Sequence, residues 1–136
     1  ELWIRGHRVF SIDKDPRAPI PVKETPAWHF RVDICEFEFK GPFDLIYDIN
    51  TLCHVDRPPW EKIKKALKPE GLFFSICPTY NSPSYIGIGK KFTRTYAEGG
   101  LRETLRAHFS EVTIHRRTEP DFKGHEIDSW IAEARP

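Results

Sequence analysis

The sequence predicts an α/β domain whose sheet is mostly parallel and ends in an antiparallel hairpin. Short apolar runs typical of buried strands alternate with amphipathic segments at helical spacing, which is the order expected when helices connect parallel strands. The last two apolar runs are separated only by a short polar stretch that contains a glycine, as in a hairpin.

Size and composition predict one domain over residues 1–136. A hydrophobic share of 39%, with 13% aromatic residues, suits a folded core rather than a disordered segment. The 21 basic and 20 acidic side chains give a net charge of +1, which favours neither a nucleic acid nor a membrane as partner. No apolar run approaches the roughly 20 residues that cross a bilayer, so we expect a soluble, cytoplasmic protein. The three cysteines lack paired spacing, so we expect neither a metal site nor a disulfide framework.

The first third of the chain predicts two short strands and a long connection. Leu2–Gly6 is typical of a helix end that a glycine terminates, and Arg8–Ile12 predicts a strand. Four prolines between Lys14 and Pro26 exclude a regular helix there. Apolar and polar residues then alternate over Trp28–Cys35, which predicts a second strand with two distinct faces.

The middle of the chain predicts a buried strand followed by a helix. Phe43–Ile49 is largely apolar, as in a strand that is covered on both faces. Pro58 and Pro59 open the helix, because proline is tolerated where the first amides have no helical partner. On this helix Glu61 can pair with Lys65 one turn later.

The rest of the chain predicts a strand, a loop, a helix and the hairpin. Residues 72–76 form the next buried strand, and residues 77–96 form a long loop without a clear period. Leu101, Leu105 and Phe109 mark the core face of the second helix. The first strand of the hairpin begins at Val112, and the second extends over Ile127–Ala134.

Ligands of open α/β sheets bind where strands end at their carboxyl side. An acidic residue directly after a strand can accept two hydrogen bonds from a ribose diol, and Asp13 has that position. Asp33 ends the second strand and can accept a hydrogen bond from an adenine amine. The alternative for both residues is that they only begin a turn, as aspartates after strands often do.

Five segments, in this order along the chain, resemble class I S-adenosylmethionine-dependent methyltransferases. Arg5–Asp13 resembles the end of their first helix with the second strand, and Phe30–Ile34 resembles the third strand. Phe43–Val55 resembles the fourth strand with its turn, and Ala66–Gly71 is similar to the turn before the fifth. Ser129–Pro136 resembles the last strand of small-molecule methyltransferases of the tellurite-resistance and thiopurine type.

The resemblance implies a Rossmann-like methyltransferase sheet with S-adenosylmethionine as the cofactor. Asp13 would hold the ribose hydroxyls, and Asp33 would face the adenine amine with the Ile34 amide near the ring. Asn50 and Thr51 would approach the methionine portion of the cofactor.

His54, Pro78 and Tyr80 would line the substrate side. His54 is the candidate catalytic base, because histidine titrates near neutral pH. The alternative is that it only lines the pocket, since many methyl transfers need no base beyond alignment with the sulfonium. No Asn-Pro-Pro-Tyr or Asp-Pro-Pro-Tyr motif follows the fourth strand, which argues against an amino-directed DNA methyltransferase.

The family's first strand and its glycine-rich loop have no counterpart in this sequence, and the chain contains no methionine. We therefore expect a truncated or processed chain with residues upstream of Glu1. In the family, the first strand would lie between the strands that end at Asp13 and Ile49. The exposed backbone groups could be satisfied in three ways: by a segment outside this sequence, by direct pairing of the flanking strands, or by a second chain in a homo-oligomer.

The expected function is S-adenosylmethionine-dependent methyl transfer to a small-molecule acceptor. The alternative is a catalytically inactive methyltransferase-like fold that serves as a binding or assembly module. The two hypotheses share a fold and differ in whether the cofactor binds.

Overall fold

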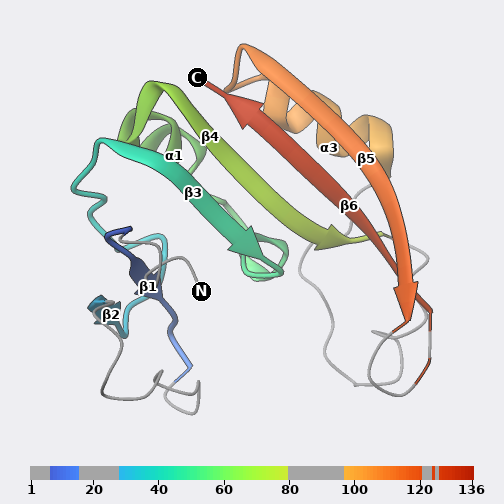
Figure 1. Cartoon of the computed structure of the whole chain (residues 1–136), viewed down its shortest axis with the longest axis horizontal. Coiled ribbons are helices and arrows are strands. Elements are labelled where there is room, and N and C mark those ends of the chain that lie inside the picture. Colours follow the sequence, from blue (N-terminus) through green and yellow to red (C-terminus); the bar gives the residue numbers. More distant parts are fainter. Residues whose placement is uncertain (1–6, 16–27, 80–96, 121–123, 125) are drawn as a thin grey trace. The chain divides into compact units, whose positions relative to one another are not determined.

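The computed structural model describes residues 7–15, 28–79, 97–120, 124 and 126–136 (Figure 1). The chain divides into two compact units, Glu1–Glu38 and Phe39–Pro136. Several predictions lie outside the described residues: the helix end at Leu2–Gly6, most of the proline-rich connection, Tyr80 with the loop to residue 96, and most of the hairpin turn. None of the helices in the described part of the chain is long and apolar enough to cross a membrane.

The first unit contains a two-stranded parallel sheet of β1 (Phe10–Ile12) and β2 (Trp28–Phe30). The Phe10 and Trp28 rings stack with their centroids 5.0 Å apart. β2 is shorter than the predicted strand, which extended to Cys35. The reason is a turn at Asp33, whose side chain accepts a hydrogen bond from the Cys35 amide and whose carbonyl accepts one from the Glu36 amide.

The second unit contains a mixed four-stranded sheet in the order β3-β4-β6-β5. Its strands are β3 (Phe43–Ile49), β4 (Leu67–Pro78), β5 (Glu111–Pro120) and β6 (Glu126–Arg135). β3 and β4 are parallel, whereas β4–β6 and β5–β6 are antiparallel. The prediction of a mostly parallel sheet is therefore wrong. Both strands of the predicted hairpin form, but β6 lies between β4 and β5, so two of the three strand pairs are antiparallel.

Two helices cover one face of this sheet. The helices α1 (Trp60–Ala66) and α3 (Glu98–Arg106) both appear behind the strands in Figure 1. Phe73 of β4 lies at the centre of the core, edge-on to Trp60 at 5.9 Å and stacked on Phe109 at 5.7 Å between ring centroids. Ile63 of α1 is buried as well, and the burial of Leu101, Leu105 and Phe109 confirms the predicted core face of the second helix.

β4 begins at Leu67, five residues before the predicted strand. Phe43 pairs with Leu67 and Leu45 pairs with Leu72, so most of the turn expected over Ala66–Gly71 is an irregularity inside the strand. Gly71 is needed there, because a Cβ atom at this position would lie 2.9 Å from the Phe43 carbonyl oxygen.

β3 has the predicted bounds, but its predicted burial on both faces is wrong. Leu45, Tyr47 and Ile49 are 41%, 49% and 53% exposed. Alternate residues of a strand point to opposite faces, and the two helices cover only the face that carries Ile46 and Asp48. β3 is also an edge strand, with β4 as its one neighbour among the described strands.

Candidate functional site

The parallel pairing of β1 and β2 places Asp13 and Asp33 at the same edge of their sheet. The Asp13 amide donates to the Phe30 carbonyl at 3.1 Å, and its exposed carboxylate accepts the Asp15 amide at 2.8 Å. The Lys14 ammonium lies 3.2 Å from Asp33 Oδ2 and links the ends of the two strands. The structure therefore brings together the two residues that were predicted to bind the ribose and the adenine.

Asp33 is held in its anionic form by its neighbours. The hydrogen bond from the Cys35 amide, followed by the one from Lys14, holds the pKa of this carboxyl below its usual value. Ile34 lies within the same turn and is half-buried. A carboxylate has about four acceptor positions, so Asp33 retains capacity for a donor from a ligand.

A buried carboxylate organises the turn at the end of β3. Asp48, 6% exposed, accepts hydrogen bonds at Oδ1 from the amides of Thr51 at 3.0 Å and Leu52 at 3.2 Å. Its Oδ2 accepts the Ser75 hydroxyl at 2.7 Å. Burial raises the pKa of Asp48, although these hydrogen bonds act in the opposite direction.

Asn50, Thr51 and His54 follow Asp48 in this turn. Asn50 has a left-handed backbone with φ of 56°, and its amide donates to the Ile76 carbonyl at 2.8 Å. Thr51 and His54 are exposed, and His54 is the last residue of the 3₁₀ helix η2 (Leu52–His54). The structure thus places these three predicted residues in one short segment of the second unit.

The end of β4 is fixed by a second buried acid. The Pro78 side chain is fully buried in the strand. Thr79 follows it and donates from its hydroxyl to Asp128 Oδ2 at 3.1 Å. Arg116 donates to the same carboxylate from Nε at 2.9 Å and from its terminal nitrogen at 2.6 Å. These hydrogen bonds from Arg116 are the main reason why the pKa of Asp128 lies below its usual value.

Two thiols lie in the interior near Asp48. Cys53 and Cys77 are buried and free, and Cys53 Sγ donates to the Asn50 carbonyl at 3.0 Å. Burial, with a further contribution from the Asp48 charge, raises the pKa of both thiols to about 12. Within the described residues, no group of three or more potential ligands could hold a metal ion.

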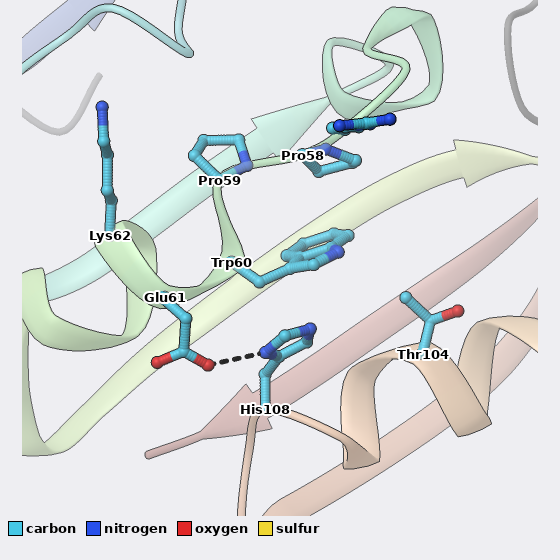
Figure 2. Close-up of a pocket in the computed structure, with 8 residues that line it drawn as sticks. Pro58, Pro59, Trp60, Glu61, Lys62, Thr104 and His108 are labelled. Carbon is cyan, nitrogen blue, oxygen red and sulfur yellow. Dashed lines mark hydrogen bonds and ion pairs between the residues drawn. The ribbon is translucent and has the colours of Figure 1, made fainter.

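A shallow groove of about 430 Å³ lies beside α1 and α3 (Figure 2). Figure 2 shows the indole of Trp60 beside the imidazole of His108, and their ring centroids are 6.3 Å apart. Glu61 Oε1 lies 2.7 Å from His108 Nδ1, so its main contact is this histidine rather than the predicted Lys65. None of the described residues that were predicted for the site lines this groove.

Sequence reasoning missed the roles of Asp48 and Ser75. A charged residue near the end of an apolar strand was the available signal, because such a group is buried only where partners satisfy it. Ser75 gave no local signal, since it lies 27 residues from Asp48 and meets it only through the β3–β4 pairing.

No protein-family model matches the chain, and no curated protein matches it in sequence. Solved structures do match its fold. An S-adenosylmethionine-dependent methyltransferase of Methanosarcina mazei superposes with a TM-score of 0.71 at 16% identity, over 98% of this chain and 84% of that one. DhpI in complex with SAM and HEP superposes with a TM-score of 0.59 at 15% identity, over 98% of this chain and 73% of that one.

A third structure, the precorrin 8w decarboxylase of Methanobacterium thermoautotrophicum, superposes with a TM-score of 0.56 at 15% identity, over 95% of this chain and 70% of that one. At such identities the likeness concerns the fold alone, which is methyltransferase-like. The tellurite-resistance and thiopurine subtype and the truncation of the chain stay predictions.

Proposed function

We propose that this chain binds S-adenosylmethionine and serves methyl transfer to a small-molecule acceptor. The observation that carries the proposal is the placement of Asp13 and Asp33 at the carboxyl edge of one parallel sheet, in a fold shared with S-adenosylmethionine-dependent methyltransferases. The chemistry of these two groups fits the cofactor, because a ribose diol and an adenine amine are donors and carboxylates accept from them. When bound, the cofactor supplies an activated methyl group on its sulfonium.

Asn50 and Thr51 are the proposed contacts to the methionine portion of the cofactor, and His54, Pro78 and Tyr80 are the proposed substrate contacts. Asn50 and Thr51 stand on the turn after β3, where ligands of α/β sheets bind. His54 is exposed, so its imidazole can reach a ligand. It can take a proton from the small molecule that receives the methyl group, where that molecule must lose one. Pro78 is fully buried, which suits a role in shaping the end of β4, and Tyr80 remains a proposed substrate contact.

The alternative is an inactive methyltransferase-like fold that acts as a binding or assembly module. It is favoured by one specific observation, the exposure of Leu45, Tyr47 and Ile49 on a strand that lies at the edge of the sheet formed by the described residues. Exposed apolar side chains that gather on one face of a strand are suited to contact with another chain.

Calorimetric titration with S-adenosylmethionine tests the proposal. Replacing Asp13 by Ala removes hydrogen bonds to a charged group, each contributing about 1.5–3 kcal/mol, so we expect the dissociation constant to rise at least about tenfold. Glu38→Ala is the matched control, because it removes another exposed carboxylate from the same unit and should leave affinity unchanged.

The outcomes separate the hypotheses. Equal affinity of the Asp13→Ala variant and the unmodified chain would contradict the assignment of Asp13 to the ribose. Absence of binding by the unmodified chain would favour the binding or assembly module.

A further inference from the structure

Asp48 uses both of its carboxylate oxygens on the turn after β3 and on the neighbouring strand. Oδ1 accepts the amides of Thr51 and Leu52, and Oδ2 accepts the Ser75 hydroxyl of β4. The carboxylate therefore connects the beginning of η2 to the centre of the sheet. Its three donors lie 3, 4 and 27 residues further along the chain.

The turn needs such a connection because its backbone is unusual. Asn50 adopts a left-handed conformation, which asparagine adopts more readily than most residues but which still costs free energy outside glycine and persists where the surroundings hold it. Support comes from two sides. The Asn50 amide continues the β3–β4 ladder by donating to Ile76, and Asp48 holds the two amides that come next. The direction in which Asn50 and Thr51 leave the sheet thus depends on Asp48.

A buried carboxylate is a costly way to end a strand. Removing a charge from water is unfavourable unless hydrogen bonds compensate, and an apolar side chain suits the covered face of a sheet better. Departures from this pattern are expected at functional sites, where geometry matters more than stability. Asp48 lies two residues before Asn50 and three before Thr51, the two residues proposed to meet the methionine portion of the cofactor.

We propose that Asp48 is a positioning residue of the cofactor site, acting through the amides of Thr51 and Leu52 to set the conformation in which Asn50 and Thr51 meet the ligand. This inference rests on the proposed binding of S-adenosylmethionine. It assigns Asp48 no direct contact with the cofactor.

Three variants of the full chain test the proposal, each measured by titration with S-adenosylmethionine and by amide hydrogen exchange of Thr51 and Leu52. Asp48→Ala leaves both amides without their acceptor, so we expect faster exchange and at least about tenfold weaker binding. Asp48→Asn retains an oxygen for the amides and can bond Ser75 through its amide group, so we expect affinity within about threefold of the unmodified chain. Asp44→Asn is the control, because Asp44 lies on the same strand, is exposed and pairs with Lys68.

Ser75→Ala provides a second route if Asp48→Ala does not fold. It removes only the hydrogen bond to Oδ2, so we expect faster exchange of the Thr51 and Leu52 amides and weaker binding. Unchanged exchange and affinity in Ser75→Ala, or in a folded Asp48→Ala variant, would overturn the proposal. Equal loss of affinity in Asp48→Asn and Asp48→Ala would overturn it too, because the charge itself would then be required.

Failure of the proposed function gives a different result. If the unmodified chain binds no S-adenosylmethionine, the proposed function and the cofactor role of Asp48 both fall. The exchange measurement then still decides whether Asp48 holds the turn.

Discussion

At the scale of single residues, burial near the ends of β3 and β4 has its clearest chemical effect on two thiols. The pKa of Cys53 and of Cys77 is raised to about 12, since burial and the nearby Asp48 charge both oppose a thiolate. Cys35 lies in the other unit and is only half-buried. The three cysteines should therefore differ in their reactivity toward alkylating reagents.

We expect iodoacetamide to label Cys35 first in the folded chain at pH 8. The thiolate is the reactive form, and at a pKa of about 12 only about one thiol in ten thousand is ionised at this pH. As long as the pH stays below the pKa, each increase of one pH unit raises the thiolate fraction about tenfold. Labelling of Cys53 and Cys77 should accelerate by the same factor. Mass spectrometry of peptides measures the rates, and labelling of all three cysteines in denaturant is the control. Labelling of Cys77 as fast as Cys35 in the folded chain would contradict the prediction.

The residues of the candidate site could be predicted only where the signal is local. Asp13 directly follows the last residue of β1, as the sequence predicted. Asp33 was predicted to end the second strand, but it lies three residues beyond the end of β2, in a turn. The partners of Asp48 and Asp128 could not be predicted. Ser75 lies 27 residues from Asp48 and Thr79 lies 49 residues from Asp128, and such pairs depend on strand register rather than on local periodicity.

At the scale of elements, the bounds of β3 were predicted correctly and its surroundings were not. An apolar run has the same sequence whether one or both faces of the strand are covered, because coverage depends on where the helices pack. Here Trp60 and Phe109 both contact Phe73, which places α1 and the segment directly after α3 on the same face. The order of β5 and β6 in the sheet was equally beyond local patterns, since the hairpin is antiparallel whichever of its strands lies next to β4.

This arrangement is tested by substituting one isoleucine in the core between the sheet and α1 and one on the exposed face of β3. Ile63 of α1 is completely buried, so Ile63→Ala should lower the free energy of unfolding by about 2–5 kcal/mol. Ile49 of β3 is 53% exposed, so Ile49→Ala should change it by no more than about 0.5 kcal/mol. Denaturant unfolding followed by circular dichroism measures both values. A loss above about 2 kcal/mol in Ile49→Ala would show that this face is covered in solution.

At the scale of the whole molecule, the chain was predicted to form one domain, whereas its contacts group into the units Glu1–Glu38 and Phe39–Pro136. The four-stranded sheet and both helices belong to the second unit. Its core residues, such as Phe73, Ile63 and Leu105, come from these elements as well. The one-domain prediction depends on whether the first unit is needed for the second to fold.

We expect a chain of residues 39–136 to fold by itself and a chain of residues 1–38 not to fold. The longer chain retains all three strand pairs of its sheet and the buried contacts of both helices. The described strands of the shorter chain have three residues each, and below about 40 residues a chain rarely buries enough apolar surface to fold without disulfides or metals. Cys35 is the one cysteine in that segment, so no internal disulfide can form there. Circular dichroism during denaturant titration should show a cooperative transition for residues 39–136 and none for residues 1–38. If residues 39–136 unfold without cooperativity while the full chain shows one sharp transition, the two units stabilise each other and the chain behaves as a single domain.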